Sequence, residues 1–252
     1  MRAVILCEGT TDLLMIQYVL QYRYDWEYEG FWENSVTNKL LKKTLKKDGS
    51  NIEIQSCGGI TNIPIKMKSI KDQLEYVTRK EEFIDKVIIL IDHDTIDSNR
   101  EFIEQINENL GTQFVEEDIN SNSKWIINNF VLGQCQVDLF FKCLPENETG
   151  AIEKIMLEAL TTDEVEENLI KDSNDFITEM AQKQNRYLRK KSRISKAVFN
   201  TYFAIRIPEE KYDERARILK AYDWKNNETI NKNFNFDTYN SLTPNWYYKV
   251  LR

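Results

Sequence analysis

The sequence has few residues that break regular structure and no long apolar run. Its 252 residues include only 8 glycines and 4 prolines, which argues against a chain dominated by loops. No window approaches the roughly 18 uninterrupted apolar residues of a membrane helix. The opening apolar run ends at Glu8 after about five residues, too short for a signal peptide. We expect a globular, cytoplasmic protein that makes no contact with a membrane.

The sequence also has few cysteines and no net positive charge. The four cysteines, at positions 7, 57, 135 and 143, lack the spacing of a zinc site or a disulfide framework, so we expect them to be reduced. Lys and Arg number 34 against 41 Asp and Glu, a formal charge of −7, which excludes a polycation wrapped around nucleic acid. Any contact with nucleic acid must be local. No P-loop motif occurs, so a nucleotide-driven step needs a separately encoded ATPase.

Three segments of the first half repeat one pattern, in which a short apolar strand is followed by a turn and an amphipathic helix. We expect strands at 2–7, 51–56 and 87–91, and helices at 13–20, 63–77 and 102–110. Such repeated units are typical of a parallel sheet flanked by helices. A fourth strand is expected at Trp125–Leu132. The sequence therefore predicts an α/β fold built on a parallel sheet.

The second half changes character, because helical periodicity continues there while convincing strands disappear. Helices are expected at 150–160, 164–184 and 195–205. We place a domain boundary near residue 145. This gives an α/β domain at 1–145 and a mainly helical C-terminal lobe at 146–252 that completes the site.

Carboxylates stand at the expected ends of two of these strands. Glu8 follows the first strand, and Asp92 and Asp94 follow the third. The carboxyl ends of parallel strands share one edge of a sheet, so these acids can converge there. Clustered carboxylates repel one another unless a cation neutralises them, and oxygen ligands suit Mg²⁺ or Mn²⁺. The alternative interpretation is that these acids are solvated turn residues or helix caps.

Two motifs in this order resemble the Toprim domain of topoisomerases, bacterial primases and several nucleases. They are Glu8-Gly9-Thr10-Thr11-Asp12 after the first strand and Asp92-His93-Asp94 after the third, about eighty residues later. The resemblance covers roughly residues 2–135. It implies a Toprim-like fold and metal-dependent chemistry on phosphodiester bonds.

The second half is most similar to that of the overcoming-lysogenization-defect (OLD) type nucleases. The chain has no room for the extra domains of topoisomerases or primases. The OLD-like branch adds a helix acid and a later lysine, which Glu153 and Lys196 match, although Ala151 stands where that pattern often has serine. The chain resembles small Toprim proteins encoded beside ATPases in phage-defence loci.

The resemblance implies a role for each of these residues. Glu8, Asp92, Asp94 and Glu153 would hold one or two Mg²⁺ or Mn²⁺ ions, with Asp12 as a further ligand or a supporting residue. Lys196 would neutralise charge on the scissile phosphate. The only histidine, His93, is expected to face away from the aspartates flanking it and to pack or form hydrogen bonds.

One segment, Gln182–Lys196, reverses the charge of the chain with seven cations and no acid in fifteen residues. We predict that it contacts the phosphate backbone of nucleic acid, with Tyr187 interleaved. The alternative is a solvated helix face. The residues predicted to bind nucleic acid are Arg186, Arg189, Lys190, Lys191 and Arg193.

The sequence as a whole predicts a Mg²⁺- or Mn²⁺-dependent nuclease of anti-phage defence, acting on DNA or RNA and forming a homodimer if it cuts two strands. Two alternatives stay open. One is a catalytically silent Toprim scaffold that binds nucleic acid or an ATPase. The other is a phosphatase or nucleotidyl transferase that uses the same acids on a small molecule.

Overall fold

The computed structural model describes residues 1–28, 42–95, 97–114, 124–146, 148–161, 163–183, 186–206 and 224–239. The chain divides into two compact units. The sheet unit contains Met1–Ile91, Asn99–Lys142 and the described residues from Phe234 onward. The helical unit contains Asp92–Ser98 and Cys143–Asn233. The sequence predicts a single boundary near residue 145, whereas the chain passes between the units at several points.

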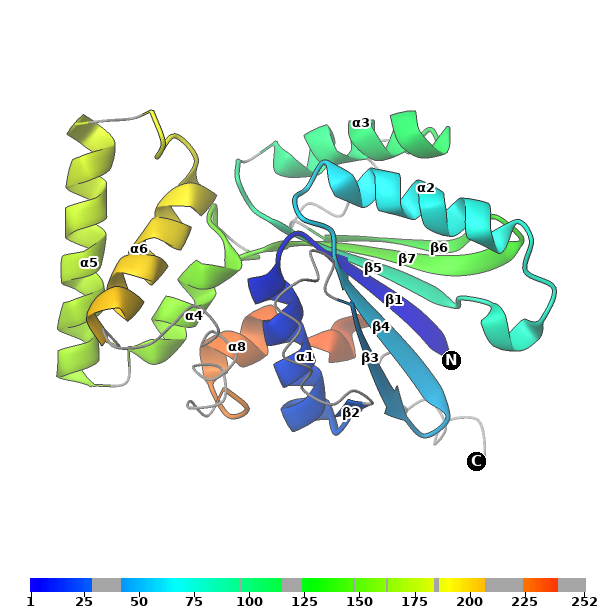
Figure 1. Ribbon diagram of the computed structural model, residues 1–252, viewed down its shortest axis with the longest axis horizontal. Coiled ribbons are helices and arrows are strands. Elements are labelled where there is room, and N and C mark those ends of the chain that lie inside the picture. The colour runs from blue at the N-terminus through cyan, green and yellow to red at the C-terminus, as the bar shows by residue number, and fades with distance from the viewer. Residues whose placement is uncertain are drawn as a thin grey trace. The chain divides into compact units, whose positions relative to one another are not determined.

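The strands form a seven-stranded sheet in the order β2-β3-β4-β1-β5-β7-β6 (Figure 1). The central strand β1 is parallel to β4 and to β5, and its Cys7 lies opposite Ser56 and Leu90. Antiparallel pairs join β2 to β3, β3 to β4 and β6 to β7. The strand bounds are β1 Arg2–Cys7, β2 Glu27–Tyr28, β3 Lys42–Lys47, β4 Ser50–Ser56, β5 Lys86–Asp92, β6 Lys124–Leu132 and β7 Cys135–Leu144.

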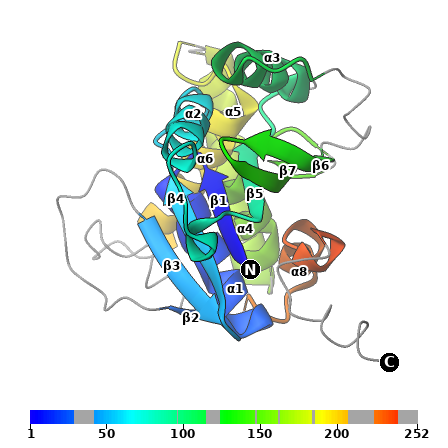
Figure 2. The same ribbon diagram turned by 90° about the vertical axis from the view of Figure 1, so that its right-hand side faces the viewer.

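Helices cover both faces of this sheet. They are α1 (Thr10–Tyr24), α2 (Asn62–Leu74) and α3 (Ser98–Leu110), with a short 3₁₀ turn at Lys80–Glu82. Helices α2 and α3 lie on one face and α1 on the other, as Figures 1 and 2 show. Every residue of Val87–Ile91 in β5 is buried, as expected for a central parallel strand covered on both sides.

The α/β fold with a parallel centre to its sheet is confirmed, since β1 runs parallel to β4 and β5, but the outer pairs make the sheet mixed rather than wholly parallel. The predicted strand at Trp125–Leu132 exists as β6, but it pairs antiparallel with β7, which the sequence analysis missed. Strand β3, Lys-Lys-Thr-Leu-Lys-Lys, was also missed because Leu45 is its only apolar residue. Leu45 is fully buried, while the lysines keep this outer part of the sheet charged.

The helical unit confirms the predicted change to helices after the sheet. Its helices are α4 (Ile152–Leu160), α5 (Glu164–Lys183), α6 (Lys191–Arg206) and α8 (Glu228–Asn233). The predicted helices at 150–160, 164–184 and 195–205 correspond to α4, α5 and α6, with Gln184 outside the described residues and α6 starting four residues earlier. The sequence analysis did not predict α8.

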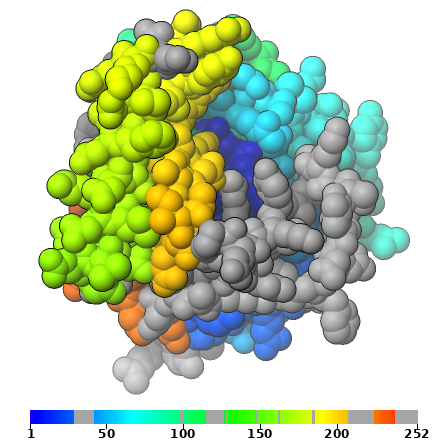
Figure 3. Space-filling model, turned by 60° about the vertical axis from the view of Figure 1, so that its left-hand side comes forward, coloured from blue at the N-terminus to red at the C-terminus, as the bar shows by residue number. Residues whose placement is uncertain are grey.

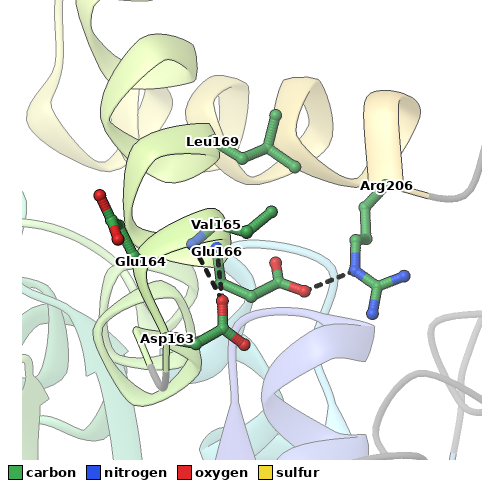
Figure 4. Close-up of a pocket in the computed structure, with 6 residues that line it drawn as sticks. All are labelled: Asp163, Glu164, Val165, Glu166, Leu169 and Arg206. Carbon is green, nitrogen blue, oxygen red and sulfur yellow. Dashed lines mark hydrogen bonds and ion pairs between the residues drawn. The ribbon is translucent and has the colours of Figure 1, made fainter.

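Helices α5 and α6 lie side by side (Figure 3) and are joined through one buried carboxylate. Glu166 accepts a hydrogen bond from the Tyr202 hydroxyl at 2.5 Å. It also forms an ion pair with Arg206, whose Nε donates a hydrogen bond at 2.7 Å. Asp163 caps α5 by accepting hydrogen bonds from the backbone N–H groups of Val165 and Glu166, and Figure 4 shows the shallow pocket around these groups. Two of the carboxylates lining that pocket are therefore used internally.

Within the described residues, no helix combines the length and the apolar character needed to cross a membrane.

The hairpin between β6 and β7 generates a stability prediction. Gly133 has φ of +62°, and a Cβ there would lie 2.7 Å from the backbone carbon of Leu74 in α2. We expect Gly133→Ala to lower the free energy of unfolding by about 2–3 kcal/mol through strain and overpacking, measured by chemical denaturation. Gly49→Ala is the matched control, since Gly49 has φ of +74° but open space around it. Equal losses in the two variants would contradict the proposed clash with α2.

Candidate functional site

The turn after β1 is fixed by backbone hydrogen bonds to the turn after β4. The carbonyl oxygen of Glu8 accepts hydrogen bonds from the N–H groups of Gly58 at 2.8 Å and Gly59 at 2.9 Å. Gly58 and Gly59 have φ of +75° and +129°, a region that favours glycine. These two hydrogen bonds hold Glu8 at the carboxyl end of the central strand. The Glu8 residue is partly exposed.

Asp12, the last residue of the EGTTD motif, caps helix α1. Its Oδ2 accepts a hydrogen bond from the Gly9 N–H at 2.7 Å, and the side chain is buried. A Cβ on Gly9 would lie 3.0 Å from that same oxygen, which accounts for glycine at this position. Part of the motif therefore serves to begin a helix. The predicted metal role of Asp12 stays a prediction.

Asp92 is the last residue of β5 and is only 3% exposed. Lys196 Nζ of α6 donates to Asp92 Oδ2 at 2.5 Å, and the backbone N–H of Ile152 also donates to this carboxyl group. Burial raises the pKa of Asp92, whereas Lys196 and the Ile152 N–H lower it and nearby Asp94 raises it further. Since Ala151 offers α4 no side-chain cap, Asp92 supplies an acceptor at the start of that helix.

Asp94 forms a second ion pair, nearer the surface. Lys190 Nζ donates to its Oδ2 at 2.7 Å, and the Asp94 and Lys190 side chains are 18% and 52% exposed. Its other oxygen, Oδ1, is buried and has no hydrogen-bond partner in the described part of the chain. A buried carboxylate oxygen without a donor is costly, so this atom is suited to a cation or to a further donor.

His93, between the two aspartates, is held by its backbone and its ring. Its N–H donates to Leu144 and its carbonyl accepts from Gly150, at 2.9 and 2.8 Å. The ring Nδ1 lies 3.1 Å from the carbonyl oxygen of Pro145, so Nδ1 carries the proton. The hydrogen-bonding role expected from the sequence is thus the arrangement found.

The helical unit brings four of the predicted residues into two pairs, Asp92 with Lys196 and Asp94 with Lys190. Glu153 lies in the first turn of α4, directly after the residue that donates to Asp92, and is 4% exposed. Lys190, predicted as a simple phosphate contact, is thus also the partner of an acid. Lys196, predicted to face a phosphate, contacts Asp92.

Among the residues that the structure describes, no three His, Cys, Asp or Glu side chains are grouped as metal ligands. The ammonium groups of Lys190 and Lys196 lie against the carboxylate oxygens that a divalent ion would use. They supply part of the positive charge that such an ion would bring. The donor set itself, carboxylate oxygens that include the buried Oδ1 of Asp94, has the chemistry that Mg²⁺ and Mn²⁺ prefer.

The other predicted nucleic-acid contacts lie on the surface around the start of α6. Arg186 and Arg189 precede the helix, and Lys191 and Arg193 stand in its first turn; all four are exposed. No acid occurs in that turn, although the positive end of the helix dipole disfavours cations there. This end of α6 therefore attracts anions by both side-chain and backbone charge.

Comparison with known proteins places the chain in a family. Residues 2–236 match the family described as proteins of unknown function (DUF3226). The chain belongs to this family. A search of curated proteins finds no significant match. Among solved structures, the chain is similar to a hypothetical protein from Pyrococcus horikoshii OT3 with 14% identity and a TM-score of 0.48, covering 96% of this chain and 99% of that one.

Sequence reasoning missed how the lysines and acids are paired. Lys190 and Lys196 stand 96 and 104 residues after their partners, Asp94 and Asp92, so no local spacing links them. It also missed the Ile152 N–H as a partner of Asp92. The one usable signal was the lack of a capping side chain at Ala151, which indicates that an acceptor comes from elsewhere.

The pair of Asp92 and Lys196 generates a prediction. We expect Lys196→Met to lower the free energy of unfolding by about 1–3 kcal/mol, because it leaves a buried carboxylate without its ammonium, the range allowing for the partial exposure of Lys196. In an Asp92→Asn background the same change should cost at least about 1 kcal/mol less, since no charge is stranded. Chemical denaturation of the four proteins in the cycle measures both effects.

Lys190→Met is the matched control, because its pair is more exposed and should contribute about 0–1 kcal/mol. An equal cost of Lys196→Met in both backgrounds would show that the ion pair does not stabilise the fold.

Proposed function

We propose that the protein is a Mg²⁺- or Mn²⁺-dependent nuclease that hydrolyses phosphodiester bonds of DNA or RNA. One observation carries the proposal: the ion pair of Asp94 and Lys190 joins a pair of closely spaced carboxylates to a segment rich in cations. Residues 186–196 contain six cations and no acid. A metal-dependent nuclease uses this combination, acids that hold a metal ion beside cations that hold the phosphate backbone.

The carboxylates fit a divalent ion. Asp92 is almost fully buried with a raised pKa, and Asp94 keeps one buried oxygen without a hydrogen-bond partner in the described part of the chain. A bound ion would lower the pKa of a water molecule and stabilise the leaving oxygen. Glu8 and Asp12 remain proposed ligands because the resemblance of EGTTD to the Toprim motif implies that role. Glu153, after Ile152, completes the proposed set.

The two lysines have a second role in this proposal. Lys196 and Lys190 hold the carboxylates in the arrangement described, and their Nζ atoms lie within 2.7 Å of the oxygens that an ion would take. A divalent ion held by those carboxylates would replace the positive charge that the lysines now supply to them. Lys196 would then be available to neutralise negative charge on the scissile phosphate.

The setting of the reaction is part of the same proposal. The motifs EGTTD and DHD resemble those of the Toprim domain, and Glu153 and Lys196 match the helix acid and the later lysine of its OLD-like branch. This resemblance supports a role in anti-phage defence with a separately encoded ATPase. Cys7, Cys57, Cys135 and Cys143 are all free and buried, in keeping with the reducing cytoplasm. If the protein cuts two strands, we expect it to form a homodimer.

One observation favours a second function, a catalytically silent scaffold. Each aspartate already has a lysine partner, and the described residues hold no ready-made group of three metal ligands. In a scaffold these pairs would be purely structural, and the basic segment would bind nucleic acid without cutting it.

Cleavage assays separate the two functions. We expect the protein with Mg²⁺ or Mn²⁺ to cut at least one of supercoiled plasmid, single-stranded DNA, ribosomal RNA and transfer RNA. EDTA, Asp92→Ala and Asp94→Asn should each reduce the rate at least about a hundredfold. Asp94→Asn keeps the test valid if Asp92→Ala unfolds, because Asp94 is less buried.

Asp72→Asn, which changes an exposed acid on α2, is the control and should cut at the wild-type rate. If the wild-type protein cuts none of the four substrates and binds neither ion in calorimetry, the result contradicts the nuclease and favours the scaffold function.

Salt dependence of binding tests the basic segment. We expect Arg189→Ala, Lys191→Ala and Arg193→Ala together to lower the slope of log affinity against log salt by about two for a single strand. Lys190 and Lys196 are left intact, so the ion pairs with the acids survive. The control replaces three exposed cations of the sheet unit, Lys68, Arg79 and Lys80, and has the same net charge. Equal slopes in the two triple variants would show that only net charge matters.

A further inference from the structure

The proposed nuclease leaves its substrate open, and the segment before α6 bears on that choice. Tyr187 is 65% exposed, although a tyrosine ring normally buries part of its apolar surface. The guanidinium carbon of Arg186 lies 5.4 Å from the centre of its ring. Arg186 thus covers one ring face, and the exposure of Tyr187 leaves the opposite face to solvent.

The surroundings of Tyr187 direct a polyanion to it. Residues 186–196 are all neutral or positive, and Lys190, three residues after Tyr187, contacts Asp94 of the candidate site. Helix α5, which precedes the segment in the chain, has the opposite net charge, with six acids and two lysines. A phosphate backbone bound to the helical unit is therefore attracted to the segment and repelled by α5.

We propose that Tyr187 is a stacking platform for an unpaired base and that the substrate is single-stranded nucleic acid. This rests on the proposed nuclease function and names its substrate class. A ring with one open face beside backbone-binding cations is the arrangement by which proteins hold single strands, since every base has a π-face to stack. In a duplex the bases are stacked on one another and offer no free face to Tyr187.

Binding measured without cleavage tests this surface. The probes are fluorescein-labelled oligothymidylate and oligouridylate of about 12 nucleotides, and a blunt-ended, fully paired duplex of equal length, titrated in EDTA by fluorescence anisotropy. We expect Tyr187→Ala to weaken binding of both single strands about tenfold and to leave binding of the duplex unchanged. Tyr187→Phe keeps the ring and should bind within about twofold of wild type. Tyr76→Ala removes another exposed tyrosine, in the sheet unit, and should have no effect.

Three results would overturn the inference: no binding of single strands by the wild-type protein, unchanged binding by Tyr187→Ala, or an equal loss for the single strands and the duplex. Its failure is distinguishable from failure of the nuclease. Cleavage without an effect of Tyr187→Ala would remove only the platform. An effect on single-strand binding without any cleavage would remove only the nuclease.

Discussion

The candidate site depends on one charge held out of water, the carboxylate of Asp92. Burying such a group is costly unless hydrogen bonds and an opposite charge compensate for the lost solvation. Here Lys196 supplies the charge and the Ile152 N–H supplies a hydrogen bond, while α4 gains an acceptor that Ala151 does not offer. The end of β5, the start of α4 and the first turns of α6 are therefore fixed by a single side chain.

The second ion pair, between Asp94 and Lys190, lies nearer the surface than the first. Asp92 is buried deeper than Asp94, and the lysine partner of Asp94 is the more exposed of the two lysines. The two acids are two residues apart in the chain, and their lysine partners are six residues apart. Because both pairs form, the position of the basic segment along the end of β5 is fixed at two points. The nuclease that we propose requires that a divalent ion take the place of these two ammonium groups.

The sequence was sufficient to predict an element where the residues of that element alone carry the signal. The apolar runs of β1 and β5 predict buried strands directly, and acids placed after them predict where a site would form. Strand β3 could not be predicted, because Leu45 alone is apolar and the strand depends on pairing with β4. Strand β7 does carry a signal, since Cys135, Val137 and Leu139 alternate as buried residues after the turn at Gly133. The pairing of Lys190 and Lys196 with the two acids had no local signal in the sequence, because the partners are about a hundred residues apart.

The path of the chain between its units has a consequence for its synthesis. Phe234 and Phe236 are buried in the sheet unit, where the Phe236 N–H donates to the Tyr24 hydroxyl at 3.1 Å. The ribosome makes α1, which contains Tyr24, more than two hundred residues before these phenylalanines. The sheet unit thus cannot bury its whole core while the chain is still emerging, although domains generally fold in order from the N-terminus. During translation, the apolar surface that these rings cover stays open until the helical unit has been made.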